Sequence, residues 1–363
     1  MLPDFTKMLI DLGIPKLAAA IVLFVIGLLL LIKCGDWFVD GASGIAQKFH
    51  VPEILIGATV VSIGTTLPEV MVSATSAVSG HSQMAYGNAV GSIICNTALI
   101  AAITVAIKPS KVTRKSMIVP VCFFFAAMGY YAFNAYCYKE FSRTSGIILL
   151  AIFILYMIVL VSQAIREMKA AGKSVEATEQ PVLTAEQMAE KADAEQEAKE
   201  KEKSLLACLL FLVIGAAGIA VGADLLVDNG TILATEMGVP ESVVALTFVA
   251  LGTSLPELVT AITSLAKGHG ALSLGNIIGA NLFNLVFVSG LAITLRPFAI
   301  PADMEIAGKI SSLVVDVPVS ILVMVVLTVP TLIRGKLSRF QGILLLAIYA
   351  AFCVYQFVAP GLL

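Results

Sequence analysis

The sequence predicts an all-α membrane protein with ten transmembrane helices, arranged as two inverted five-helix repeats. Two observations lead to this fold class. Hydrophobic residues make up 58% of the chain and charged residues only 13%, whereas a soluble domain carries about a quarter charged residues. The sequence of the first half also recurs in the second half.

Each half holds five apolar segments that can reach the length needed to cross a bilayer. In the first half they cover about 15–46, 53–78, 84–107, 116–136 and 145–165. In the second half they cover about 204–235, 241–266, 272–294, 308–331 and 340–360. Because five is an odd number, the second half enters the membrane from the opposite side, so the repeats are inverted.

The two halves align without a gap over most of their first three segments. Asp36 matches Asp224, an offset of 188 residues (224 − 36), and the same offset joins Asn96 to Asn284. The most similar stretches contain Leu-Pro-Glu, at 67–69 and at 255–257. Internal duplication of this kind is typical of membrane transporters.

A polar, charged linker separates the halves. We expect a first repeat over 1–165, a linker over 166–203 in which Thr184 and Gln187 form a capping box, and a second repeat over 204–363. In one orientation the short inner loops carry nine basic residues against six outside, and the linker adds seven to the inner side. The positive-inside rule then places both termini in the periplasm and the linker in the cytoplasm, as in a multi-pass inner-membrane protein.

Several function classes are disfavoured. A net charge of −2 gives no reason to expect a nucleic-acid partner. The six cysteines lack the spacing of zinc ligands. Neither Gly-x-Ser-x-Gly nor His-Glu-x-x-His occurs, so we expect no hydrolase, no other enzyme and no bound cofactor.

The second segment of each half should be a broken helix. Gly64–Glu69 and Gly252–Glu257 each contain a proline, which lacks an N–H group and so leaves the carbonyl four residues earlier without its helical donor. Within a membrane, such backbone is tolerated where it is buried in protein or lines a watery cavity. Thr65 and Glu69 lie four residues apart and share a helix face, as do Thr253 and Glu257.

The third segment of each half should form the other wall of the same site. Gly87 and Gly91, and likewise Gly275 and Gly279, form a Gly-x-x-x-Gly face that admits a close neighbour. Further along, Ser92 and Asn96 point the same way, and Asn284 matches Asn96 in the second half. Carboxylates at membrane depth mark ion pathways. Two acids with amide, hydroxyl and backbone oxygens suit Ca²⁺, which takes six to eight oxygen ligands, and should also suit Na⁺.

The remaining buried acids have open roles. Asp316 has no counterpart in the first half and is either a helix-packing hydrogen-bond partner or a proton site. The four acids late in the first segment of each half are either structural partners or cavity-lining groups, namely Asp36, Asp40, Asp224 and Asp228.

These motifs closely resemble the alpha repeats of the sodium/calcium exchanger family, in its bacterial and archaeal form. The resemblance covers both halves and implies ten helices, four ion sites and alternating access by sliding of the first and sixth helices. It implies a calcium site made by Glu69 and Glu257 with the carbonyls of Thr65 and Thr253. It also implies flanking sodium sites, made by Thr65, Thr66, Ser92, Thr253 and Ser254 with the backbone of Ser62 and Ala250, and it matches the family's third-helix asparagine to Asn96.

Two positions depart from the family pattern. Family members often have an acid at the position of Asn284 and a serine at that of Ala280. From the resemblance we expect Na⁺/Ca²⁺ antiport. The two departures leave the sodium stoichiometry open. The sequence also leaves open the affinities, the physiological direction and the oligomeric state. A proton-coupled calcium antiporter of the same fold is an alternative, and a passive cation channel is a remote one.

Overall fold

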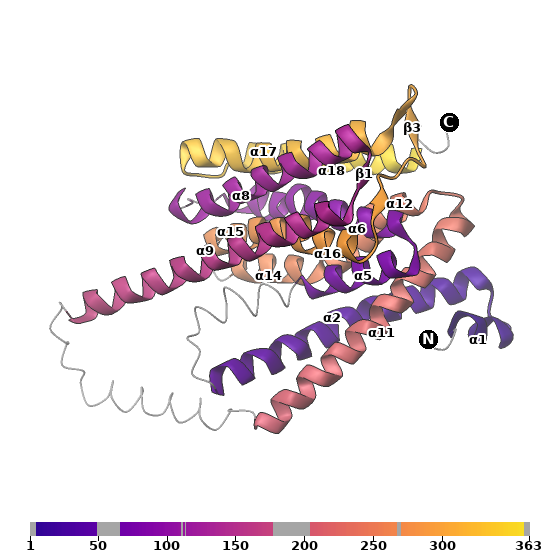
Figure 1. Ribbon diagram of the computed structural model, residues 1–363, viewed down its shortest axis with the longest axis horizontal. Helices are drawn as coiled ribbons and strands as arrows, with labels where there is room; N and C mark the ends of the chain where they lie inside the picture. The colour runs from indigo at the N-terminus through magenta and orange to yellow at the C-terminus, as the bar shows by residue number, and fades with distance from the viewer. Residues whose placement is uncertain are drawn as a thin grey trace.

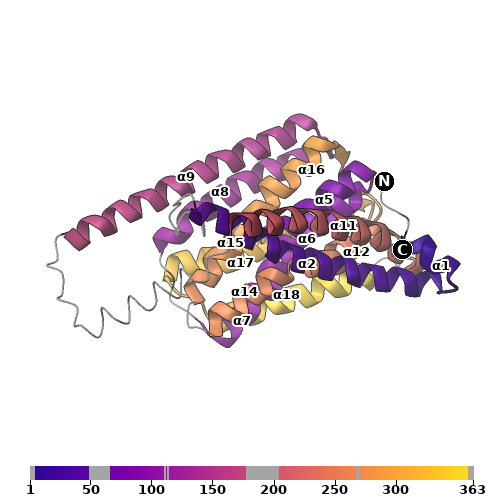
Figure 2. The ribbon, with the colours of Figure 1, turned by 90° about the horizontal axis from the view of Figure 1, so that it is seen from below.

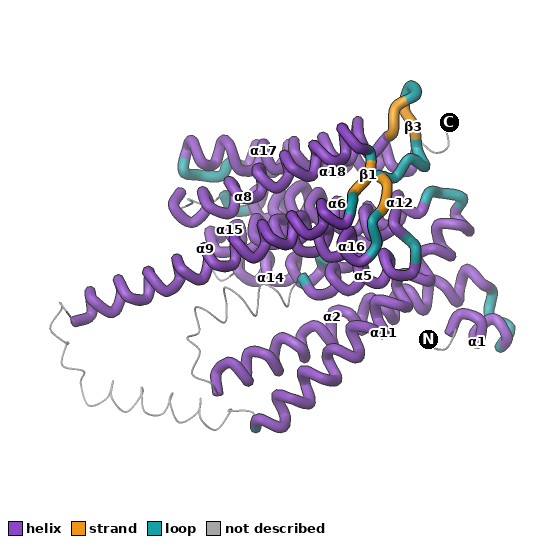
Figure 3. The backbone as a smooth tube through the Cα atoms, in the orientation of Figure 1, coloured by secondary structure: helices purple, strands orange, loops and turns teal. Residues whose placement is uncertain are grey.

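The computed structural model describes residues 5–48, 66–109, 112, 114–176, 204–266 and 270–358, and it is mostly helical (Figures 1 and 3). Among these residues, eight helices are long and apolar enough to cross a membrane. They are Lys16–Phe38, Ser82–Ile107, Met117–Tyr138, Arg143–Gln163, Leu205–Met237, Ile277–Leu295, Ser312–Arg334 and Arg339–Val358. Each overlaps one of the segments expected from the sequence.

The other two expected segments contain the prolines. The second-half segment is divided into α12 (Glu241–Val244), the π-helical turn η4 (Ala245–Val249), α13 (Ala250–Thr253) and α14 (Leu255–Ala266). The first-half segment is described from Thr66 onward, where α5 (Leu67–Ser79) begins. The expected residues before Thr66 lie outside the described part of the chain.

Two long helices form a pair that runs obliquely across the rest of the molecule (Figures 1 and 2). They are α2 (Lys16–Lys48), which follows the short α1 (Phe5–Asp11), and α11 (Leu205–Met237). Glycine allows them to approach closely, because a Cβ atom on Gly27 would lie 2.8 Å from the Gly222 carbonyl oxygen.

The centre of the bundle is formed by two interrupted helices. The first runs through α6 (Ser82–Cys95), η2 (Asn96–Ala101) and α7 (Ala102–Ile107), and the second through α15 (Gly270–Phe283), η5 (Asn284–Val288) and α16 (Ser289–Leu295). In the membrane-length stretch of each of these helices 78% of the residues are buried, whereas in that of α9 22% are buried. The third segments of the two halves therefore lie innermost, as the polar residues on them require.

The outer helices pack around this centre. They are α8 (Arg114–Phe133) with η3 (Asn134–Tyr138), α9 (Arg143–Glu176), α17 (Val317–Arg334) after η6 (Ser312–Asp316), and α18 (Arg339–Val358). Helix α9 continues past 165 into the range expected for the linker. The expected capping box at Thr184 and Gln187 lies outside the described residues.

Short strands connect the loops at one end of the bundle. Strand β1 (Glu140–Phe141) pairs antiparallel with β2 (Phe298–Ala299), so it joins the α8–α9 loop to the α16–α17 loop. Strands β3 (Glu305–Ile306) and β4 (Lys309–Ile310) form a separate hairpin. Neither small sheet was expected from the sequence.

Candidate ion-binding site

Two fully buried carboxyl groups lie at the starts of two helices. Glu69 is in the first turn of α5 and Glu257 is in the first turn of α14, and both side chains are 0% exposed. The two groups are close enough to repel each other electrostatically. A proline precedes each acid, because the first turn of a helix tolerates proline and favours a negative charge.

The expected helix break is present in the second half. Ser254 separates α13 from α14 with φ −86° and ψ 8°. Thr66 takes nearly the same backbone conformation before α5, with φ −88° and ψ 0°. Both residues are buried beside the carboxyl groups' helices. Two expected ligands of the first half, Ser62 and Thr65, lie outside the described residues.

Side chains from one broken helix contact the other. The Ser254 hydroxyl donates a 3.2 Å hydrogen bond to Glu69 Oε1. Asn88 in α6 donates from Nδ2 to the Glu69 carbonyl at 3.1 Å and accepts from Thr253 Oγ1 at Oδ1, also at 3.1 Å. Asn88 therefore holds the two proline turns together. Asn88 was not among the ligands predicted from the sequence, although its repetition as Gly87-Asn88 and Gly275-Asn276 was a usable signal.

Several buried polar groups have no hydrogen-bond partner among the described residues. They are Ser92 Oγ, both amide atoms of Asn96 and of Asn284, and the second carboxyl oxygen of Glu69. All four side chains are 0% exposed. An unsatisfied buried polar group costs about 1–3 kcal/mol, so a bound cation would stabilise groups of this kind. Hard cations bind oxygens of this type.

The two asparagines occupy the same kind of position. Asn96 begins η2 and Asn284 begins η5, and each of these π-helical turns interrupts a central helix. A π-turn shifts the helical hydrogen bonds by one residue and is frequent at functional sites. The Ser289 hydroxyl donates a 3.1 Å hydrogen bond to the Asn284 carbonyl within the second turn.

Two expected sodium ligands make helical hydrogen bonds in this conformation. The Ala250 carbonyl accepts from the Ser254 N–H at 3.1 Å, and the Thr253 hydroxyl donates to the Val249 carbonyl at 3.1 Å. The Thr253 hydroxyl also lies 3.3 Å from the Ala250 carbonyl and 3.1 Å from Asn88 Oδ1, so its single proton is shared among three acceptors, and its oxygen lone pairs stay available to a cation.

The Gly-x-x-x-Gly prediction holds for the first half. A Cβ atom on Gly87 would lie 2.5 Å from Ala245 Cβ, and one on Gly91 would lie 2.7 Å from the Leu246 carbonyl oxygen. Helix α6 therefore packs directly on the broken helix. No described residue lies within 4 Å of a Cβ atom on Gly279, so the described part of the chain does not show the same packing in the second half.

A further buried amide, that of Asn281, contacts a central helix and breaks the symmetry of the halves. Asn281 donates from Nδ2 to Thr97 Oγ1 at 2.7 Å, and its Oδ1 has no partner among the described residues. Position 93, which matches Asn281 at the repeat offset, is isoleucine. The sequence offered no duplicated pattern that would have identified this contact.

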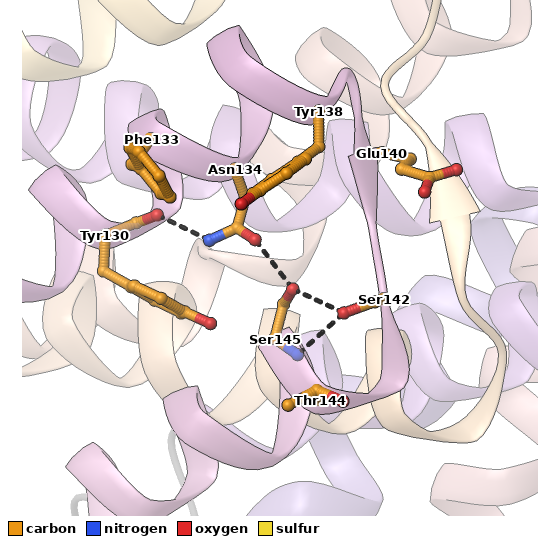
Figure 4. Close-up of a pocket in the computed structure, with 8 residues that line it drawn as sticks. All are labelled: Tyr130, Phe133, Asn134, Tyr138, Glu140, Ser142, Thr144 and Ser145. Carbon is orange, nitrogen blue, oxygen red and sulfur yellow. Dashed lines mark hydrogen bonds between the residues drawn. The ribbon is translucent and has the colours of Figure 1, made fainter.

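A separate hollow of about 460 Å³ lies at the turn between η3 and α9 (Figure 4). Two of its polar side chains are linked, because Asn134 Nδ2 donates to the Tyr130 carbonyl and Ser145 Oγ donates to Asn134 Oδ1, both at 2.8 Å. None of the expected ion ligands lines this hollow. These hydrogen bonds hold the turn between η3 and α9.

Known proteins resemble the chain over most of its length. The model of the sodium/calcium exchanger protein family matches residues 19–162 and 207–358. The inner membrane protein YrbG of Escherichia coli is 34% identical over 77% of this chain and 80% of the relative. The sodium/calcium exchanger MaX1 of Methanosarcina acetivorans is 29% identical over 92% of this chain and 97% of the relative.

A solved structure agrees with these matches. The sodium-calcium exchanger NCX_Mj, soaked with Na⁺ and Sr²⁺, superimposes with a TM-score of 0.56 at 29% identity, covering 92% of this chain and 98% of that chain. The family match leaves out the linker and includes both halves, as the motifs required. The resemblance seen in the sequence is therefore confirmed, and the chain belongs to the sodium/calcium exchanger family.

Proposed function

We propose that this protein is a secondary active antiporter that exchanges Na⁺ for Ca²⁺ across the membrane by alternating access. One observation carries the proposal. Two buried carboxyl groups, Glu69 and Glu257, begin two helices at proline turns, and they are accompanied by buried side-chain oxygens of Ser92, Asn96 and Asn284 that have no partner among the described residues. Family membership supports Na⁺ and Ca²⁺ as the transported ions.

Charge balance explains how the two ions oppose each other. Two carboxylates neutralise one Ca²⁺, and they can instead be neutralised by Na⁺ ions that use overlapping oxygens. We propose that the residues taking part are Ser62, Thr65, Thr66, Glu69, Ser92, Asn96, Ala250, Thr253, Ser254, Glu257 and Asn284. Because one cargo excludes the other, exchange needs no chemical step and no bound cofactor, and the protein acts as a transporter, not as an enzyme.

The proposed architecture has ten transmembrane helices in two inverted repeats, 1–165 and 204–363, with a cytoplasmic linker over 166–203. Matching features at the offset of 188 support it. Thr66 and Ser254 share a backbone conformation, and Asn96 and Asn284 each begin a π-turn. The two proline helices would then approach the site from opposite sides of the bilayer.

We place the protein in the cell inner membrane with both termini in the periplasm. The match to an inner membrane protein supports the location, and the distribution of basic residues supports the orientation. In this orientation the end of the bundle that carries β1 to β4 is the outer end.

Calcium uptake into proteoliposomes tests the function. Vesicles loaded with Na⁺ and diluted into Na⁺-free buffer should accumulate ⁴⁵Ca²⁺ against its gradient. Vesicles with a pH gradient and no Na⁺ should not, which separates this function from proton-coupled exchange.

The direction of the flux distinguishes an exchanger from a passive channel. An exchanger accumulates Ca²⁺ above equilibrium only while the Na⁺ gradient lasts, whereas a channel only equalises it. Uptake that persists with equal Na⁺ on both sides, in the absence of any other ion gradient, would contradict the proposal.

A further inference from the structure

A third acid lies inside the bundle, and the exchange reaction above does not use it. Asp316 closes η6 at the start of α17 and is only 2% exposed. Gln356 in α18 donates a 2.8 Å hydrogen bond from Nε2 to Asp316 Oδ1. The helix-packing hydrogen bond expected from the sequence is therefore present. It does not explain why a side chain that can carry a charge occupies this buried position.

The groups around Asp316 are neutral. The Ser312 hydroxyl faces the carboxyl group from one turn earlier, and the hydroxyls of Tyr86 in α6 and Tyr131 in α8 lie within electrostatic range of it. These three side chains are at most 3% exposed. An ionised carboxyl group in such surroundings costs several kcal/mol unless a positive charge accompanies it.

No basic side chain of the described residues pairs with Asp316. Lys309, on the neighbouring strand β4, is exposed to solvent and makes no ion pair with it. The other charged group acting on Asp316 is Asp303, in the loop between β2 and β3, and it has the same sign. The described residues therefore supply no positive charge that would offset an ionised Asp316.

A proton fits this position better than a metal ion. The site has a single carboxyl group, and the amide N–H of Gln356 already contacts it, where a metal ion would need an oxygen. The hydroxyl of Tyr86 is buried and interacts with the hydroxyl of Ser312. It can accept a hydrogen bond from a protonated carboxyl group.

We propose that Asp316 is a proton-binding site whose occupancy regulates ion exchange. This function goes beyond the proposed antiport, which needs only Glu69 and Glu257. It would make the protein sensitive to pH through a residue outside the ion site.

Exposed and buried groups connect this acid to water and to the ion site. Asp303 is exposed, lies at the end of the bundle with the strands, and accepts a 2.6 Å hydrogen bond from Ser242 in α12. Its carboxylate lies within electrostatic range of Asp316 at the end of the bundle that water reaches.

On its other side Asp316 faces Tyr131, which also interacts with Ser289. Ser289 in turn donates to the Asn284 carbonyl at 3.1 Å. Asp316 is thus linked to the proposed ligand Asn284 through the side chains of Tyr131 and Ser289, without direct contact.

The solvation of Asp316 determines whether a rise in pH speeds or slows ion exchange. A neutral Asp316 suits the closed bundle, whereas an ionised Asp316 favours an arrangement that admits water at this end. Loss of the proton at higher pH should promote opening, so exchange should become faster. Coupling between two sites typically changes a rate or affinity by about fivefold or more.

The experiment compares four forms of the full chain in proteoliposomes. Sodium-driven calcium uptake is measured across the neutral pH range, with equal pH on both sides. The wild type should accelerate about fivefold as pH rises. Asp316→Asn, a neutral mimic, should stay at the slow rate throughout, Asp316→Glu should restore the pH response, and Glu305→Gln, an exposed acid on β3, should match the wild type.

A second measurement does not depend on transport. Infrared difference spectra of the purified protein between low and high pH should show loss of a neutral carboxyl band in the wild type and in Glu305→Gln. Part of that band should be missing in Asp316→Asn. A wild-type pH profile or an unchanged infrared difference in Asp316→Asn would overturn the proposal. Absence of sodium-driven uptake in the wild type would instead contradict the proposed antiport and leave the infrared result to decide the proton site.

Discussion

The Ser254 hydroxyl donates a 3.2 Å hydrogen bond to Glu69 Oε1, across 185 residues of sequence. Ser254 is the residue at which one broken helix is interrupted, and Glu69 is in the first turn of the other. The turn that frees the backbone in one half thus orients the acid of the other half. The proline turns of the two halves therefore contact each other directly.

This contact predicts that Ser254→Ala weakens sodium binding more than calcium binding. The mutation removes a proposed sodium ligand and a hydrogen bond to a charged group, worth about 1.5 kcal/mol, or about tenfold in affinity. The sodium concentration that gives half-maximal calcium uptake should rise accordingly. Ser254→Thr, which keeps the hydroxyl, is the matched control. An unchanged sodium dependence in Ser254→Ala would mean that this hydroxyl does not bind sodium.

Replacement of either buried acid by its amide should abolish calcium transport. Glu69→Gln or Glu257→Gln leaves one negative charge to balance a divalent ion at a 0% exposed site. Removing one member of a buried charge set costs about 3–5 kcal/mol, so calcium flux should fall at least about 100-fold. Insertion is checked by gel filtration, with Glu305→Gln as control. Flux within about twofold of the wild type in either mutant would contradict the assignment.

Asn284→Asp should shift selectivity toward calcium. The added charge would lie beside two carboxylates and would interact twice as strongly with a divalent ion as with a monovalent one. Calcium affinity relative to sodium affinity should rise by about tenfold, or about 1.4 kcal/mol. Competition of Na⁺ with ⁴⁵Ca²⁺ binding measures the ratio. If the ratio stays at the wild-type value, Asn284 does not face the ions.

Gly91→Ala should destabilise the bundle and slow exchange. Its Cβ atom would lie 2.7 Å from a buried backbone oxygen, that of Leu246. Overpacking of this kind costs about 1–3 kcal/mol. Thermal unfolding in detergent measures the loss. Gly129→Ala in α8, where no atom lies within 4 Å of the added group, should leave stability unchanged or raise it. Equal stabilities for the two mutants would contradict the packing described here.

The linker should be dispensable for transport. Replacing 177–203 by a Gly/Ser chain of equal length keeps α9 intact to Glu176 and preserves the connection to Ser204. Calcium uptake should stay within about twofold of the wild type, because the segment lies outside both proposed repeats. A folded protein without flux would show that the linker takes part in the cycle.

The sequence predicted the helices and the break at Ser254 because apolar length and proline act locally. The sequence also predicted that Glu69 and Glu257 share one site, because an acid at the same position of both repeats indicates a shared role. The role of Asn88 depends on tertiary packing, which brings Glu69 and Thr253 to opposite ends of one amide. The π-turns at Asn96 and Asn284 differ from an α-helix by one residue in hydrogen-bond register, and composition does not reveal such a shift.

The pairing of β1 with β2 has an evolutionary consequence. The pairing consists of main-chain hydrogen bonds, which any residue other than proline can make. Of the four residues in β1 and β2, Phe141 alone is buried. The centroid of its ring lies 4.5 Å from the ring centroid of Tyr131 and 5.8 Å from that of Phe298. The other three positions can therefore drift in sequence while the two loops stay joined, so divergent homologues should keep the length of these loops more faithfully than their residues.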